Sequence, residues 1–303
     1  MQKVIRIATR KSPLALWQAN FIKSELLKHH PELIIELIPM TTQGDQVVDR
    51  SLSKIGGKGL FVKELENALL NNEADIAVHS MKDVPMHLPE GLIMSAMTAR
   101  GSVEDVFVSE KFHKIEDLPS GARVGTSSAR RKTILQREYP HLESVDVRGN
   151  VQTRLKKCET GEVDALILAA AGLERLDLSD KITQRLPLDL WLPAPGQGAI
   201  GIESRVDDYQ LNQYLKAIND QDTWTALTAE RMLSRVLNGG CSVPLAAYAA
   251  LENEVLFLRA WWVSPDNQHF AYAEARKHHS HAEALGEEVA NVIKQSMHSR
   301  HAS

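Results

Sequence analysis

The stretch Val4-Ile5-Arg6-Ile7-Ala8-Thr9-Arg10-Lys11-Ser12-Pro13 sets the fold at the start of the chain. Its first part, Val4–Thr9, is largely apolar and predicts a short strand, and Ser12-Pro13 supplies an N-cap and a proline at the first helical position. We therefore expect a strand followed at once by a helix that runs to about Lys28. A strand that leads directly into a helix is the building unit of α/β folds.

The same order of elements recurs further along the chain. Val124-Gly125-Thr126 leads into a helix predicted from Ser128 to Tyr139, as Ile7-Ala8-Thr9 leads into the first helix. A second short match pairs Glu73–Ile76 with Glu162–Ala165. These matches indicate a degenerate repeat of two α/β halves, with mixed or parallel sheets flanked by helices and a ligand cleft at the carboxyl ends of strands.

Changes of pattern along the sequence divide the chain into three predicted domains. Domain 1 takes residues 1–99 together with a return segment, 199–219, and contains a long mobile loop at 41–59. Domain 2, residues 100–195, repeats the α/β pattern and is the predicted anion-binding domain. Domain 3, residues 222–303, is a smaller α+β domain.

Composition and charge exclude several classes of protein. The chain has 303 residues, 43% of them hydrophobic, and a formal charge of −4, so neither disorder nor a general affinity for nucleic acid or anionic lipid is expected. No apolar stretch is long enough for a membrane span, and no secretory signal is visible, which predicts a cytoplasmic protein. Cys158 and Cys241 are too few for a disulfide framework and lack zinc-site spacing, so we expect two free thiols and no metal.

Positive charge is concentrated in residues 121–157, which carry nine basic and three acidic side chains, a net +6 that leaves −10 for the rest. Some of these side chains must simply be solvated helix faces. However, Arg130-Arg131 follow Thr126-Ser127-Ser128 at a strand-to-helix turn, and Arg148-Gly149 ends the next strand. Helix N-termini and arginine forks suit carboxylate or phosphate groups, and with Tyr139 the only aromatic residue here, a small polyanion is favoured over nucleic acid.

For the other candidate sites a purely structural explanation stands beside the functional one. Lys82 and Asp83 follow a buried strand and face a predicted cleft, but such a pair is more often a surface ion pair. Cys241 follows two glycines that let a turn present its sulfur, but a free cysteine is usually a small buried hydrophobe. Residues 196–201 spell G-x-G-x-x-G without opening a helix, and residues 56–59 lack the pattern of a phosphate loop, so we reject a nucleotide site at both.

Taken together, several motifs closely resemble the porphobilinogen deaminase (hydroxymethylbilane synthase) family, in the family's order. The matching stretches are residues 6–19, 56–66, 74–85, 125–131, 148–150, 192–198 and 239–244. Ala129 stands where a larger apolar residue is common in the family, and Asn238 stands where glutamate is common. Neither position is a site residue in the family.

The resemblance implies a fold, a reaction and a cofactor. The fold would be two similar α/β domains of the periplasmic-binding-protein type that form a cleft, plus a smaller C-terminal α+β domain. The reaction would join four porphobilinogens head to tail, with release of ammonia, into the linear tetrapyrrole hydroxymethylbilane of porphyrin and haem-type biosynthesis. One dipyrromethane cofactor per chain would be bound by a thioether to Cys241. The family further implies a cytoplasmic monomer without metal, nucleic acid or membrane.

The resemblance also implies roles for individual residues. Asp83 would hydrogen-bond the pyrrole N–H and stabilise the positive charge that develops as ammonia leaves, with Lys82 and Lys58 also catalytic and Lys58 on a loop that closes over the cleft. Besides Cys241, the cofactor-binding residues would be Ser80, Lys82, Asp83, Thr126, Ser127, Ser128, Arg130, Arg131, Arg148 and Gly149. The substrate-binding residues would be Arg10, Ser12, Gln18, Arg148, Arg154, Arg175 and Gln197.

A solute-binding protein with two hinged lobes is the alternative. It explains the two α/β halves and the arginines, but it explains neither Gly239-Gly240-Cys241 nor the third domain. The mass of the purified protein separates the two hypotheses, because only the enzyme carries linked pyrroles.

Overall fold

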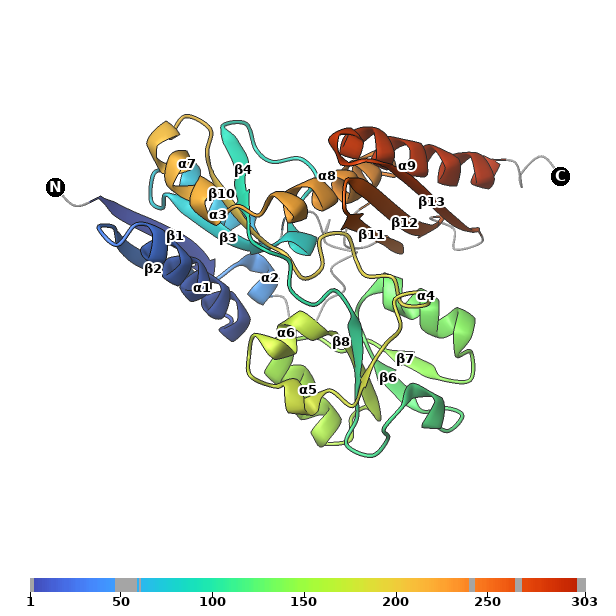
Figure 1. Ribbon diagram of the computed structural model, residues 1–303. Coiled ribbons are helices and arrows are strands. Elements are labelled where there is room, and N and C mark those ends of the chain that lie inside the picture. Colours follow the sequence, from blue (N-terminus) through green and yellow to red (C-terminus); the bar gives the residue numbers. More distant parts are fainter. Residues whose placement is uncertain (1–2, 47–58, 60, 240–242, 265–268, 299–303) are drawn as a thin grey trace. The chain divides into compact units, whose positions relative to one another are not determined.

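The computed structural model describes residues 3–46, 59, 61–239, 243–264 and 269–298 (Figure 1). These residues form two compact units. Unit 1 comprises Met1–Gly101 and Gly198–Trp224, and unit 2 comprises Ser102–Gln197 and Thr225–Ser303.

Unit 1 is built on a mixed sheet whose described strands have the order β2-β1-β3-β10-β4. β2, β1 and β3 are parallel, whereas β10 pairs antiparallel with β3 and β4. The strands are β1 Val4–Arg10, β2 Ile34–Met40, β3 Ile76–Ser80, β4 Leu92–Met97 and β10 Ile200–Arg205. The helices are α1 Pro13–His29, α2 Gln43–Gln46, α3 Lys63–Leu70 and α7 Tyr209–Leu215, with 3-10 turns η2 Met81–Asp83 and η5 Lys216–Ile218.

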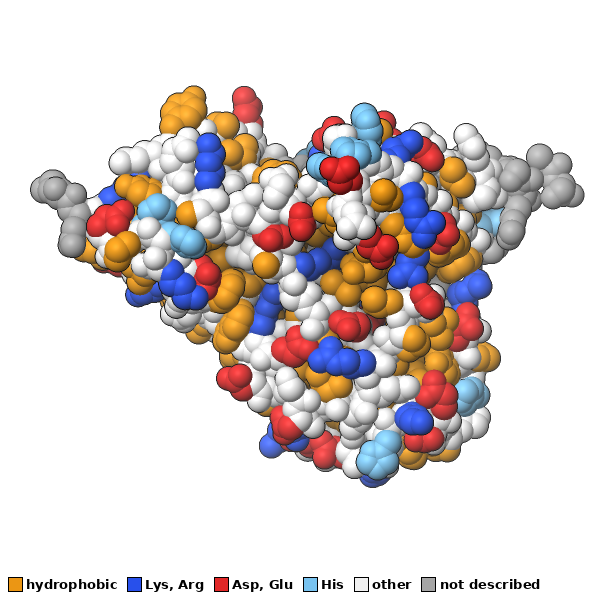
Figure 2. Space-filling model, in the orientation of Figure 1, with side chains coloured by type: hydrophobic (Ala, Val, Ile, Leu, Met, Phe, Trp, Pro, Cys, Tyr) orange, Lys and Arg blue, Asp and Glu red, His pale blue; other side chains and the backbone are white. Residues whose placement is uncertain are grey.

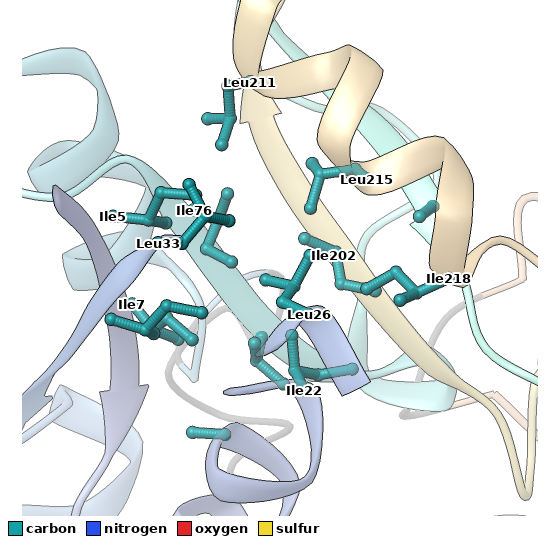
Figure 3. Close-up of a cluster of buried hydrophobic side chains, with 14 of the residues drawn as sticks. Ile5, Ile7, Ile22, Leu26, Leu33, Ile76, Ile202, Leu211, Leu215 and Ile218 are labelled. Atoms are coloured by element: carbon teal, nitrogen blue, oxygen red, sulfur yellow. The ribbon is translucent and has the colours of Figure 1, made fainter. Parts of the chain in front are cut away.

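One hydrophobic cluster holds this sheet to α1 and α7. Ile22 and Leu26 of α1 lie with Ile7 of β1, Ile202 of β10 and Leu211 of α7, and all five are fully buried (Figure 3). Each such side chain contributes about 1.5–3 kcal/mol when it leaves water. The strand that returns late in the sequence therefore shares its core with the first strand.

Unit 2 contains a second mixed sheet, with the order β7-β6-β8-β5-β9 among the described strands. β6 is parallel to β7 and β8, and β5 is antiparallel to β8 and β9. The strands are β5 Asp105–Val108, β6 Arg123–Gly125, β7 Glu143–Val145, β8 Ala165–Ala169 and β9 Gln184–Arg185. The helices are α4 Ala129–Glu138, α5 Val151–Glu159 and α6 Ala170–Glu174, with 3-10 turns η3 Ile115–Asp117 and η4 Ser179–Lys181.

The C-terminal part of unit 2 is an antiparallel sheet with the order β11-β12-β13. Its elements are α8 Gln221–Val236, which begins at the end of unit 1, β11 Leu245–Glu252, β12 Val255–Val263, β13 Phe270–His278, η6 His279–His281 and α9 Ala282–His298. Trp191 and Trp261 lie in one hydrophobic cluster that includes residues of both sheets. The buried carboxylate of Glu230 also accepts hydrogen bonds from the amides of Gly196 and Ala249, at 2.7 and 2.8 Å. The predicted boundary between domains 2 and 3 stays a prediction.

The internal repeat predicted from the sequence is confirmed by the two mixed sheets. In each sheet one strand, β1 or β6, lies between two parallel neighbours. One of these neighbours, β3 or β8, then pairs with an antiparallel strand, β10 or β5. The amide of Arg6 donates to the Asp75 carboxylate at 2.8 Å, and the amide of Arg123 donates to Asp164 at the same distance. The short sequence matches therefore mark equivalent backbone junctions.

Other details differ from the sequence prediction. The segment Leu33–Pro39 reads in the sequence as a buried strand, but β2 is an edge strand of the sheet, and Ile34 is 40% exposed while Ile35 is 5% exposed. β4 and β5 were not predicted, and β5 is short and begins with the charged residue Asp105. Within the predicted loop 41–59, α2 forms one helical turn, and residues 47–58 lie outside the described part of the chain.

Charged side chains of both signs occur on the face drawn in Figure 2. Figure 2 shows Lys and Arg interspersed with Asp and Glu on the visible face. This pattern agrees with the small formal charge of −4. Among the described residues, none of the helices combines the length and apolar character needed to cross a membrane.

Candidate active site

The predicted residues of unit 1 gather at one edge of its sheet. Arg10 ends β1 and Ser80 ends β3, and these two strands are parallel, with Ile7 beside Ile76. Parallel strands end at the same edge, where α/β proteins place their ligand sites. The sequence therefore folds so that residues far apart along the chain share this edge.

Gln18 and Ser80 are brought into direct contact. Gln18 is buried on α1, and its Nε2 donates to the Ser80 hydroxyl at 2.8 Å. Ser12 is the N-cap of α1 and accepts a hydrogen bond from the Ala15 amide at 3.3 Å, as the sequence predicted. A cap of this kind stabilises a helix by about 1 kcal/mol. Ser12, Gln18 and Ser80 thus all have contacts within the protein.

Arg10 has an acidic partner that sequence reasoning missed. Its guanidinium forms a bidentate pair with Asp45, and its Cζ lies 4.4 Å from the centre of the Phe61 ring. Burial raises the pKa of Asp45, but hydrogen bonds from Arg10 and Thr42 outweigh it and lower the pKa below its usual value. Lys58, the other cation predicted nearby, lies outside the described residues.

Asp83 occupies the last position of η2, directly after β3. It is half-buried, and none of the described residues forms a hydrogen bond or ion pair with its carboxylate. Lys82 is also half-buried and has partners of its own. The predicted surface pair between these neighbours is therefore absent among the described residues.

Three buried ionisable side chains lie on β3, β10 and α3 of unit 1. His79 of β3 and Glu203 of β10 share a hydrogen bond of 2.9 Å, and both are buried. Glu66 of α3 completes the group; burial and the nearby Glu203 carboxylate raise its pKa to about 7, although His79 opposes the change. The Glu66 carboxyl can therefore hold a proton near neutral pH. Sequence reasoning did not single out these residues.

The loop after β6 in unit 2 is built as the sequence predicted. Ser128 is the N-cap of α4 and accepts a hydrogen bond from the Arg131 amide. The Ser127 hydroxyl donates to the Val147 carbonyl at 2.7 Å, and the Thr126 hydroxyl accepts from the Ser128 amide at 3.2 Å. These contacts fix the start of α4.

Arg130 and Arg131 point into unit 2 and share one carboxylate. Both form ion pairs of 2.7 Å with Asp105, whose side chain is fully buried. Burial alone would raise the pKa of Asp105, but the two guanidinium groups hold it well below the usual range of a carboxyl. Gln197 joins the cluster, since its Nε2 donates to Asp105 at 2.9 Å and to the Val103 carbonyl at 2.7 Å. Asp105 is the main residue that sequence reasoning missed; its only signal was a charge at the start of a short apolar strand.

The remaining arginines differ in their surroundings. Arg148 is half-buried, and none of the described acidic side chains pairs with it. Gly149 has a φ of +104°, and a Cβ there would lie 2.7 Å from Thr153, so only glycine fits. Arg154 donates from Nε to the Gly149 carbonyl at 2.9 Å. Burial lowers the pKa of Arg175, which follows α6.

Cys241 lies outside the described residues, but its flanks are described. α8 ends in a left-handed cap: Asn238 has a φ of +51°, and the Gly239 amide donates to the Ser234 carbonyl at 2.7 Å. Asparagine tolerates this conformation, which accommodates the residue that departs from the family pattern. Cys158, in contrast, is buried, and burial raises the pKa of its thiol.

Several solved structures, binding proteins among them, are similar to this chain. The VFT2 domain of BvgS from Bordetella pertussis is 19% identical over 75% of this chain and 91% of its own, with a TM-score of 0.45. A putative methionine-binding lipoprotein from Bacillus subtilis is 14% identical over 73% and 92%, with a TM-score of 0.45. The aliphatic sulphonate binding protein SsuA from Escherichia coli is 14% identical over 78% and 71%, with a TM-score of 0.42.

Two family models match almost the whole chain. The model described as porphobilinogen deaminase, dipyromethane cofactor binding domain, matches residues 5–213, and the model described as porphobilinogen deaminase, C-terminal domain, matches residues 224–295. These matches decide against a solute-binding protein. The chain belongs to the porphobilinogen deaminase family.

Proposed function

We propose that one dipyrromethane per chain is bound through a thioether to Cys241, and that Asp83 acts on the reacting pyrrole. The reaction follows from family membership: the chain is a transferase that condenses four porphobilinogens, with release of ammonia, into hydroxymethylbilane in tetrapyrrole biosynthesis. The three-domain division, the monomeric state and the cytoplasmic location stay predictions.

The described residues of unit 2 fit a cofactor with several carboxylates. Arg130, Arg131 and Asp105 together carry one net positive charge. The Nε atoms of both arginines are buried and have no hydrogen-bond acceptor among the described residues. A buried N–H without a partner costs about 1–3 kcal/mol, so an incoming carboxylate would gain both a hydrogen bond and charge pairing. This arrangement is the observation that carries the proposal.

The other proposed cofactor contacts surround this pair in sequence. Arg148 offers a guanidinium that no described acidic side chain pairs with, and the neighbouring Gly149 adopts a backbone conformation, φ +104°, that favours glycine. Thr126, Ser127 and Ser128 hold the start of α4, whose amides favour an anion. From unit 1 we assign Ser80 and Lys82, at the end of β3, to the same cofactor.

When bound, the dipyrromethane supplies a free pyrrole carbon to which the porphobilinogen units are added. Asp83 accepts a hydrogen bond from the pyrrole N–H and stabilises the positive charge that develops on that nitrogen as ammonia leaves. Its lack of a described counter-ion supports this role, because an unpaired carboxylate loses no ion pair when it binds the cation. Lys82 and Lys58 add positive charge for the carboxylates of the pyrroles.

Substrate carboxylates are assigned to the remaining predicted arginines. Arg154 and Arg175 belong to unit 2, and Arg10 belongs to unit 1, where it already pairs with Asp45. Ser12, Gln18 and Gln197 are held in place by contacts within the protein, and we assign them to the substrate as well.

The mass of the intact protein tests the covalent cofactor. Wild-type protein should be heavier than the 303-residue chain by two linked pyrrole units. Cys241→Ser should lose this increment, whereas Cys158→Ser, the matched control at a buried thiol, should keep it. Fully active enzyme with an unmodified mass contradicts the proposal.

A further inference from the structure

The Asp105 side chain contacts three polar side chains of unit 2. Asp105 begins β5 and is completely buried. One carboxylate oxygen pairs with Arg130, and the other accepts hydrogen bonds from Arg131 and Gln197. Each arginine also donates from Nη1 to a main-chain carbonyl, Arg130 to Leu192 at 2.7 Å and Arg131 to Ile167 at 2.8 Å.

This set of contacts fixes the orientation of both guanidinium groups. A guanidinium is planar, so anchoring its Nη1 and Nη2 atoms leaves no freedom for the direction of its Nε–H bond. In both arginines the anchored atoms are these two, and Nε is the one without an acceptor among the described residues. Without the Asp105 carboxylate, two buried cations would face each other unbalanced and would rotate or separate.

We propose that Asp105 is a positioning residue that fixes the donors of Arg130 and Arg131 for a carboxylate of the pyrrole ligand. The proposal rests on the proposed function of these two arginines as carboxylate-binding residues. It adds that their affinity depends on a third residue, which is fully buried and paired with both of them. Asp105 is therefore expected to act on binding, and only indirectly on the chemical step.

Unit 1 contains a matched control. Asp75 bridges two arginines in the same way, with Oδ1 3.0 Å from Arg6 and 3.3 Å from Arg205. It precedes β3, at the end of the strand opposite to Ser80, and touches none of the proposed site residues that the structure describes. Asp75→Asn should thus lower stability by loss of an aspartate between two arginines without a change in ligand binding.

Two measurements with porphobilinogen as the probe test the proposal. Intact mass follows the loading of apoprotein at increasing porphobilinogen concentration, and calorimetry measures its Kd in a Cys241→Ser background, where no covalent step occurs. For Asp105→Asn we expect the half-saturating concentration and the Kd to rise at least about tenfold, as for loss of one charged hydrogen bond. For Asp75→Asn the half-saturating concentration and the Kd should stay within about threefold of the wild-type values, with a thermal midpoint comparable to that of Asp105→Asn. Asp105→Glu keeps the charge but displaces the carboxylate, so it should fold and still bind weakly if Asp105→Asn does not fold.

The outcomes separate this proposal from the proposed function. Normal loading and Kd in a folded Asp105 variant overturn the positioning role. Equal losses for Asp75→Asn and Asp105→Asn also overturn it, since the effect would then be one of stability. If wild-type protein acquires no pyrrole mass but the Kd still rises about tenfold in Asp105→Asn, the covalent cofactor fails and the positioning role stands.

Discussion

Replacing Glu66 with glutamine tests the buried group formed by Glu66, His79 and Glu203 in unit 1. Glu66 is 8% exposed, and its pKa is raised from 4.5 to about 7 by burial and by the Glu203 carboxylate, against the effect of His79. In the unfolded chain the carboxyl titrates at its ordinary value. The folded protein therefore binds more protons than the unfolded chain between these two values, and its free energy of unfolding falls as pH rises through this window.

The size of the effect follows from the shift. At about 1.4 kcal/mol per pKa unit, a rise from 4.5 to about 7 corresponds to about 3 kcal/mol. Solvent contact of the carboxylate reduces the expected change to about 2 kcal/mol. Glutamine has nearly the same shape but does not titrate. The stability difference between Glu66→Gln and wild type should therefore shift by about 2 kcal/mol in favour of the variant from about pH 5 to about pH 8.

Amide hydrogen exchange measured by mass spectrometry on peptides that cover α3 and β3 gives this free energy for the full chain. Comparing the two pH values within each protein removes any constant effect of the substitution. Glu73→Gln, which removes an exposed carboxylate just after the same helix, is the matched control for the loss of one negative charge. If Glu66→Gln keeps the wild-type pH dependence, the proton does not reside on Glu66 and the explanation from its raised pKa is wrong.

The remaining predictions concern the site residues. Asp83→Asn should keep its cofactor by intact mass but lose roughly 10²–10⁴-fold in single-turnover ammonia release, with Asp83→Glu less affected; a change of only a few-fold would move the chemistry to another residue. Arg148→Leu should raise the KM for porphobilinogen in steady-state assays while the thermal midpoint stays within a few degrees, and a normal KM would remove Arg148 from the site. Arg131→Leu should lower the free energy of unfolding in urea by about 3–5 kcal/mol, because Asp105 loses a buried partner, and an unchanged urea midpoint would contradict this pairing. Gly149→Ala should lower the free energy of unfolding by about 1–3 kcal/mol, because φ is +104° at this position. An unchanged urea midpoint would show that the backbone there tolerates alanine.

Local sequence patterns by themselves determined much of the fold. The serine caps of α1 and α4 and the strands that precede them depend on neighbouring residues, so short patterns suffice to predict them. Motif order along the chain likewise identified the family and the candidate residues. Asp83 and the loop around Ser128 could be placed at strand ends in this way, since each follows its strand directly.

Tertiary structure alone decided which charges meet. Asp105 and Gln197 are 92 residues apart, and His79 and Glu203 are 124 apart, yet each pair is joined by a hydrogen bond. One residue of each pair lies on an antiparallel strand, Asp105 on β5 and Glu203 on β10. Each of these strands pairs with a strand that is distant in the sequence, β8 or β3. No periodicity in the sequence encodes such a pairing, because a strand's partner is chosen by burial of whole faces and not by its neighbours. The sequence could thus point to arginines that bind carboxylates, but only the folded chain shows that two of them already share a buried one.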